Sequence, residues 1–346
     1  MKKIIKRISS PEDLNSKWDS LADCYFQKKE FLTHIHKYNP CCQRYYELYC
    51  DGNLSAAVVA YTLKMNILTF ANIPSSINVQ IIGLPVSVAA PPVIGDSNEF
   101  EFLLSEIIRN ESGIILGLNF ISDHLKDKVV NLRTLPTIIL NTLCDDFHSY
   151  ENSLRHDYRR RLHRIEEKFT NVKSVTTDCS VFSNEHYSLY LQIMKRTKTK
   201  LETLNKDLFK YLPSNFSLTT YYSDDQMLCW HIVCKDANEM FFFFGGMNYT
   251  LRDKYQSYNN NLLGIVTEAF NDKYHKIDFG QTAEIAKTRF GGEMSERRMF
   301  MYHKNIVILK LLRLCRNLIT YSKENNKHHV FKTEKNVSKL SAIQNY

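Results

Sequence analysis

Hydrophobic and polar positions alternate along the chain in two rhythms, one typical of strands and one of helices. Residues 43–50 and 56–63 form two apolar runs around Asp51 and Gly52, and this arrangement predicts a β-hairpin. Three further segments are predicted: a strand interrupted by prolines at 80–94, an amphipathic helix at 99–109 and a buried strand at 113–121. The first half therefore mixes helices and strands.

The second half has the same mixed pattern. Four consecutive phenylalanines, Phe241–Phe244, need apolar surroundings on both faces of a strand, so that strand is predicted to lie centrally in its sheet. Gly245 and Gly246 follow it and permit a bulge or the close approach of a ligand. Helices are predicted at about 262–271 and, with a basic amphipathic pattern, at 305–321.

The composition is that of an ordinary globular protein. Of 346 residues, 44% are hydrophobic and 24% charged, which excludes a wholly disordered chain, a collagen-like chain and a coiled coil. The length favours two domains. A formal charge of +8 fits an anionic partner such as a nucleotide, a phosphorylated cofactor or RNA, but plain solubility explains it equally well.

Three features of the sequence predict a cytoplasmic protein. The most apolar long stretch, residues 77–94, falls short of the ~20 apolar residues that a membrane span needs. Residues 1–10 are basic, but no apolar core follows them as in a signal peptide. The nine cysteines include no C-x-x-C pair and are odd in number, which favours reduced thiols over a disulfide framework.

The character of the chain changes near Ser149. Residues 155–168 carry six Lys or Arg against three Asp or Glu, with Tyr158, Leu162 and Ile165 as one thin apolar stripe. This pattern predicts a surface helix with a wide basic face. The face is either simply solvated, or it binds the phosphates of a ligand or of tRNA.

Several short motifs in the second half suggest a family. They are Tyr150–Leu154, Arg159–Arg161, Gly245–Met247, Tyr258–Asn259, Asp278–Gly280, Lys287 and Gly291. In this order and spacing, over roughly residues 150–300, they resemble the BioF2-like, Fem-related branch of the GNAT acyltransferase superfamily. Residues 80–92 are also similar to the first half of such proteins.

The resemblance implies an α/β (α+β) fold of tandem GNAT-like domains, each a mixed, mostly antiparallel sheet flanked by helices. The expected division is an N-terminal half at 1–149, an acyltransferase domain at 150–321 and a mobile, polar, basic tail at 322–346. The expected activity is N-acyl transfer from an activated carrier, acyl-CoA, to an amine of a small molecule or a cell-envelope precursor. Two alternatives stay open: a Fem-type transferase that uses aminoacyl-tRNA, and a non-catalytic relative that binds a nucleotide-linked sugar or RNA.

Three residues are candidates for catalysis. The resemblance implies that Lys287, ahead of Phe290-Gly291, points into the substrate cleft, where its ammonium would bind an anion or stabilise an oxyanion. Asp278 ends a predicted strand and would hold or deprotonate the attacking amine, or else cap the next turn. Tyr258 would donate a proton to the leaving group.

The carrier is expected as a co-substrate, with no permanently bound cofactor. The resemblance places its amides along Gly245 and Gly246, and its phosphates near Asn259, which alternatively caps a helix. Residues 248–258 lack the glycine-rich phosphate loop usual in CoA-binding GNAT enzymes, so Arg252 and Lys254 are the candidates for phosphate contact.

Gln281 and Thr282 are the candidates for orienting the substrate, and Glu284 is a substitute base. No metal site is expected, because the cluster of His34, His36 and Cys41-Cys42 matches no zinc spacing. His231 is expected to be a core histidine.

Overall fold

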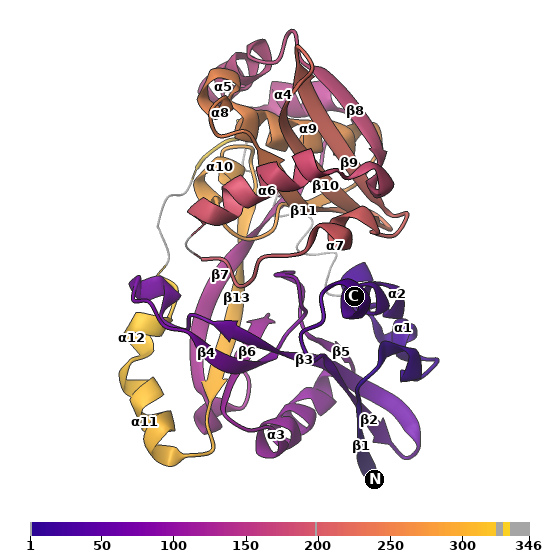
Figure 1. Cartoon of the computed structure of the whole chain (residues 1–346), viewed down its shortest axis with the longest axis vertical. Helices are drawn as coiled ribbons and strands as arrows, with labels where there is room; N and C mark the ends of the chain where they lie inside the picture. Colours follow the sequence, from indigo (N-terminus) through magenta and orange to yellow (C-terminus); the bar gives the residue numbers. More distant parts are fainter. Residues whose placement is uncertain (1, 198, 323–327, 333–346) are drawn as a thin grey trace.

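The computed structural model describes residues 2–197, 199–322 and 328–332. Over these residues, thirteen strands form one sheet that runs through both halves of the molecule, with helices packed around it (Figure 1). The strands are β1 Lys3–Ile8, β2 Arg44–Cys50, β3 Asn53–Met65, β4 Ile77–Ile82, β5 Val93–Gly95, β6 Ile114–Phe120, β7 Val130–Asn141, β8 Lys173–Asp178, β9 Phe216–Ser223, β10 Gln226–Asp236, β11 Glu239–Met247, β12 Lys276–Asp278 and β13 Glu293–Tyr302.

The α-helices are α1 Trp18–Leu21, α2 Lys29–Tyr38, α3 Phe100–Asn110, α4 Phe147–Ser153, α5 His156–Glu167, α6 Asn184–Arg196, α7 Lys206–Lys210, α8 Arg252–Tyr255, α9 Ser257–Asn271, α10 Glu284–Thr288, α11 Ile306–Leu314 and α12 Arg316–Ile319. A short 3₁₀ turn, η3 Thr69–Ala71, packs beside α12.

One unit occurs twice in the sheet. In the first half β4 and β6 pair in parallel and α3 lies between them in the chain; in the second half β11 and β12 do the same around α9. The other pairings are antiparallel. The mixed, mostly antiparallel sheet flanked by helices is the fold class that the sequence predicted.

The two units are joined by strand pairing. The late strand β13 lies between β6 and β7, and β7 continues past β13 to pair with β12 through residues 139–141. A strand of the C-terminal part of the chain thus completes the sheet beside the first half. Figure 1 shows β7 and β13 running together from one half into the other.

Local sequence explains several elements. Asp51 and Gly52 both adopt positive φ, +47° and +87°, as the two-residue hairpin between β2 and β3 requires. Strand β11, which carries Phe241–Phe244, lies between β10 and β12, so the expected central strand is confirmed, although only Phe241 of the four pairs with β12. Their side chains are only partly buried, however, because they face a cavity.

Helix α9 begins earlier than the sequence predicted. It starts at Ser257, so Tyr258 and Asn259 lie in its first turn and neither is its N-cap. The capping position is Gln256, with φ +46° and no side-chain cap bond. The expectation that Asn259 caps the helix is therefore wrong, since the helix already begins two residues before it.

The predicted helix at 305–321 is divided at Cys315 into α11 and α12. Of the expected mobile tail, the structure describes residues 322 and 328–332. Val330 is buried, and Phe331 forms a β-bridge with Leu154, so this short stretch is packed against the second half and corrects the expectation there. The rest of the predicted tail lies outside the described residues.

At Gly246 the packing leaves no room for a side chain. A Cβ there would lie 2.2 Å from the indole nitrogen of Trp230, which is fully buried. We expect Gly246→Ala to lower the free energy of unfolding by about 1–3 kcal/mol, measured by urea denaturation. Trp230→Phe removes the colliding nitrogen. In a double-mutant cycle, the double variant should therefore lose less stability than the sum of the losses in the two single variants. Strict additivity would show that the clash is not the cause.

Candidate functional site

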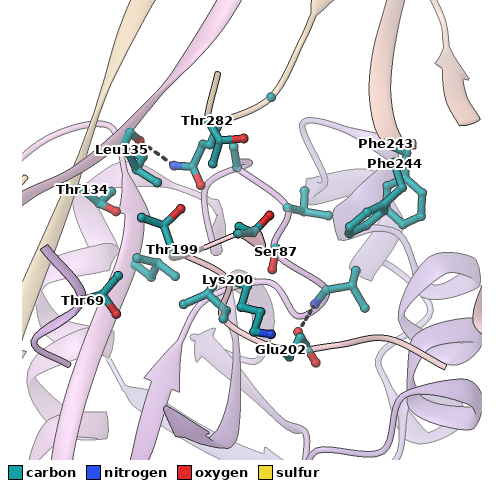
Figure 2. Close-up of a pocket in the computed structure, with 18 of the residues that line it drawn as sticks. Thr69, Ser87, Thr134, Leu135, Thr199, Lys200, Glu202, Phe243, Phe244 and Thr282 are labelled. Atoms are coloured by element: carbon teal, nitrogen blue, oxygen red, sulfur yellow. Dashed lines mark hydrogen bonds between the residues drawn. The ribbon is translucent and has the colours of Figure 1, made fainter. Parts of the chain in front are cut away.

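A cavity of about 290 Å³ lies between the two halves, and both halves line it. Its wall is mostly apolar, with Phe241–Phe244 on one side and Met299 and Met301 of β13 on another. Figure 2 shows a small number of polar side chains around it, among them Ser87, Thr282 and Glu202. A concave apolar site with few polar groups is typical of small-molecule binding.

The cavity opens where paired strands separate. Parallel pairing between β11 and β12 ends at Phe241 and Asp278, and β11 continues alone on that side to Met247. The pairing of β11 with β10 has an extra residue at Phe243, a bulge that bends the strand. Five of the six residues from Phe242 to Met247 line the cavity, so this free strand edge forms one of its walls.

Asp278 ends β12 and lines the cavity. Its Oδ1 accepts hydrogen bonds from the backbone N–H of Gly280, at 2.7 Å, and from the hydroxyl of Thr137. The first bond is the turn-capping contact that the sequence offered as the structural alternative. Asp278 therefore shapes the next turn and also presents its carboxyl group to the cavity.

Lys287 lies on α10, is 2% exposed and lines the same cavity. Its Nζ donates to the backbone carbonyls of Gln281, at 2.6 Å, and Gly280, at 3.1 Å, and lies 5.9 Å from the centre of the Phe242 ring. Burial lowers the pKa of Lys287 to about 7, although the charges of Asp278 and Glu284 act in the opposite direction. Burial thus brings the neutral amine within reach near neutral pH.

The turn that receives Lys287 is conformationally constrained. Thr282 and Ala283 both adopt positive φ, +66° and +50°, which is unusual for residues with a Cβ. Gln281 is held from the other side, because its Nε2 donates to Leu135 O at 2.5 Å and to Asn119 Oδ1 at 2.9 Å (Figure 2 draws the bond to Leu135). Backbone strain of this kind is common at functional sites.

Four other candidates from the sequence also line the cavity: Gly245, Tyr258, Gln281 and Thr282. Burial raises the pKa of Tyr258, so its hydroxyl stays protonated and available as a donor. Together with Asp278 and Lys287, these residues make up the part of the cavity wall that comes from the second half of the chain.

The remaining candidates lie outside the cavity lining. Gly246 packs against Trp230, Asn259 accepts a hydrogen bond from Arg161, and Glu284 accepts one from Tyr321. Arg252 pairs with Asp253, at 2.8 and 3.0 Å, and Lys254 lies over the Tyr255 ring. None of these five residues is part of the cavity lining.

Glu202 is a cavity residue that the sequence did not indicate. It accepts hydrogen bonds from Asn39 Nδ2 at 2.8 Å and from the backbone N–H of Val86 at 3.0 Å. Burial raises its pKa, and within the described part of the chain no ion pair reaches it. Val86 and Ser87 both have φ +59°, which is unusual for residues with a Cβ and most strained for the β-branched Val86, and no local sequence signal marks them.

A second unexpected feature is a pair of guanidinium groups around one ring. Arg196, at the end of α6, lies 4.1 Å from the Tyr249 ring centre, and Arg252 lies 5.3 Å from it. Ile193 and Met194 of α6 and Met247 of β11 line the cavity, so this cationic cluster stands next to it. The two arginines are 56 residues apart in sequence, which hides the cluster from local pattern analysis.

Among the residues that the structure describes, no group of histidine, cysteine, aspartate and glutamate has the arrangement of a metal site. His231 is fully buried, with Nδ1 3.2 Å from Asn261 Oδ1, in the core position expected for it. Of the described helices, none is long and apolar enough to cross a membrane.

Comparison with solved structures identifies the fold. L-PGS from Bacillus licheniformis matches with a TM-score of 0.51 at 11% identity, covering 91% of this chain and 98% of that one. N-myristoyltransferase from Saccharomyces cerevisiae, with bound myristoyl-CoA, matches with 0.50 at 11%, covering 86% and 78%. A protein of unknown function from Bacteroides thetaiotaomicron matches with 0.55 at 10%, covering 86% and 100%.

The chain has the tandem GNAT fold. The fold implied by the Fem-related resemblance is thereby confirmed. No family model matches the sequence, and neither does any curated protein. In this GNAT fold, the cavity lies between the two GNAT-like units, beside the diverging strands of the second.

The buried Lys287 predicts a pH dependence of stability. Its pKa is about 7 in the folded chain and about 10.4 when unfolded, so the unfolded chain binds more protons between these values. Lys287 therefore makes the free energy of unfolding rise with pH in that window, by up to about 1.4 kcal/mol per pH unit. Urea denaturation at pH 7, 8 and 9 should show this slope reduced in Lys287→Met and unchanged in Lys64→Met, an exposed control. Equal slopes in all three proteins would contradict the lowered pKa.

Proposed function

We propose that the protein is an N-acyltransferase that moves an acyl group from an acyl-CoA to an amine. The observation that supports this best is the convergence of Lys287 and Asp278 on a cavity bounded by a strand edge that β12 leaves unpaired. An acyl transfer needs a place for an extended carrier arm, a group that takes the proton of the amine, and a cavity that excludes water. Each of these has a structural counterpart here.

The carrier would enter along β11. Beyond Phe241 no β12 residue pairs with this strand, so its edge can pair with the amides of the carrier arm. Arg196, Arg252 and Lys254 supply positive charge close to the end of that edge, in place of the glycine-rich loop that the sequence lacks. Guanidinium groups bind phosphate through paired N–H donors.

Lys287 would act as the general base. A neutral amine has two N–H bonds, which match the two carbonyls of Gly280 and Gln281, and its lone pair is then left to accept a proton. The substrate nitrogen attacks the thioester carbon, its proton passes to Lys287, and a C–N bond forms as the carbonyl becomes an oxyanion. When the C–S bond breaks, the thiolate takes a proton from Tyr258, and the tyrosinate takes back the proton that Lys287 accepted from the amine, so both side chains return to their starting states.

The acceptor would lie on the side of Glu202. Glu202 is largely removed from water, and within the described part of the chain no ion pair reaches it, so it would attract the ammonium form in which an amine substrate arrives. That ammonium loses one proton to solvent before the neutral amine attacks. Ser87 and Thr282 add hydroxyl groups around the same space (Figure 2). The acceptor is thus a polar amine.

One observation favours a second donor, aminoacyl-tRNA. Helix α5 presents Arg160, Arg164 and other basic residues to solvent on the second half, as the sequence predicted. Such a face suits the phosphates of a nucleic acid. The reaction in the cavity would be the same, with an ester in place of the thioester.

Acyl transfer can be tested with a panel of acyl-CoAs and polar amines, with release of the free thiol as the measurement. We expect turnover that falls at least about 100-fold in Lys287→Met at pH 7.5, because the base is lost, with little change in KM. Lys64→Met serves as the control. Turnover with aminoacyl-tRNA but not with acyl-CoA would favour the alternative donor. If neither donor supports turnover, an enzymatic role is contradicted.

The cationic cluster predicts how the carrier binds. Replacing Arg196 and Arg252 with alanine should raise the Kd for acyl-CoA by about tenfold or more, since each lost charge-assisted contact contributes roughly 1.5–3 kcal/mol. Titration calorimetry at 50 and 300 mM salt should show the wild-type affinity falling with salt more steeply than that of the double variant. Arg109→Ala, on the surface of α3, is the matched control. An unchanged Kd in the double variant would place the phosphates elsewhere.

A further inference from the structure

Helices α11 and α12 carry an apolar stripe that faces solvent. Val307, Leu311, Leu314 and Leu318 recur at intervals of four, three and four residues, which places them on one face. Their exposed fractions are 62%, 54%, 80% and 46%. Few leucines of a folded domain are this exposed, and here they are contiguous, so the stripe is a candidate interaction surface.

The opposite side of the two helices is apolar as well. Leu309, Leu312 and Ile319 are buried there in a cluster with residues of β6, β7 and β13, so turning the helices about their axes to bury the stripe would expose these three residues instead. The segment therefore has two apolar faces, and the fold covers only one. In Figure 1 the two helices lie at the outside of the first half, away from the second.

The charged side chains of α11, of α12 and of the turn before them all have one sign, although Arg313 also donates a hydrogen bond to the backbone carbonyl of Asp127, an exposed residue of a neighbouring segment. Lys304, Lys310, Arg313 and Arg316 are exposed, and no aspartate or glutamate occurs from residue 303 to residue 322. Lys310 and Arg313 lie on the same side of the stripe, next to the exposed leucines. An apolar face bordered by cations is the pattern of a helix that lies in the interface of an anionic bilayer.

We propose that α11 and α12 bind the surface of an anionic phospholipid membrane, with the four-residue stripe among the acyl chains and the lysines and arginines at the phosphates. The positive charge beside the stripe favours a membrane over a second copy of the chain as the partner. A symmetric contact through the stripe would bring two sets of four cations together, whereas an anionic lipid surface neutralises them.

The surface is connected to the cavity. Leu318 points outward from α12, whereas its neighbour Ile319 lines the cavity. Phe70 of η3 also lines the cavity, and its ring lies 5.8 Å from that of Tyr321, just after α12. Membrane binding would thus hold an apolar part of the cavity wall close to the lipid, where acyl groups concentrate.

The test is co-sedimentation of the full chain with large unilamellar vesicles, either of phosphatidylcholine alone or with 30% phosphatidylglycerol. We expect binding to the anionic vesicles, at least tenfold weaker binding to the neutral ones, and loss of binding between 50 and 500 mM salt. The triple variant Leu311→Ser, Leu314→Ser and Leu318→Ser should lose at least tenfold in affinity. Its matched control is the double variant Leu143→Ser and Val181→Ser, which replaces exposed apolar residues elsewhere.

A second pair of substitutions separates charge from apolar contact. Lys310→Gln with Arg316→Gln should weaken binding to anionic vesicles and leave the thermal unfolding temperature unchanged, because both side chains are exposed. Equal binding by wild type and the triple variant, or no binding to either vesicle, would overturn the proposal. So would a wild-type dimer, seen by light scattering, that the triple variant converts to a monomer.

Discussion

The parallel pairing between β11 and β12 extends over only three residue pairs, and the site depends on where it stops. It ends at Phe241 and Asp278, so the carboxyl group of Asp278 is placed at the point where the two strands separate. The bulge at Phe243 bends β11 further from β12. Phenylalanines that a closed sheet would bury on both faces are left half-covered, and their exposed faces become a wall of the cavity.

The same geometry explains the state of Lys287. Lys287 is buried beside the Phe242 ring and loses its hydration, so the amine is favoured over the ammonium. Its two carbonyl partners come from a turn with positive φ at Thr282 and Ala283, which the packing around Gln281 holds in place. Burial therefore favours the neutral amine, and the two carbonyls fix the direction in which its nitrogen points.

Much of the second half could be predicted from sequence, and the reason is local. Asp278 and Lys287 are nine residues apart on one strand–turn–helix unit, and the four consecutive phenylalanines predicted a central strand, although they are only partly buried. Glu202 and Arg196 could not be predicted, because their significance comes from partners far along the chain, Val86 and Tyr249 respectively. Asn259 was misplaced because helix α9 begins before the first strongly apolar position, with no side-chain cap to mark its start.

The cavity cannot belong to either GNAT-like unit alone. Its strand edge and its lysine come from the second unit, while Ser87, Thr134 and Phe70 come from the first. β13 joins them, because it pairs with β6 and β7 and also supplies Met299 and Met301 to the wall. The two units thus contribute differently to the cavity: the second supplies Asp278 and Lys287, and the first completes the enclosing wall.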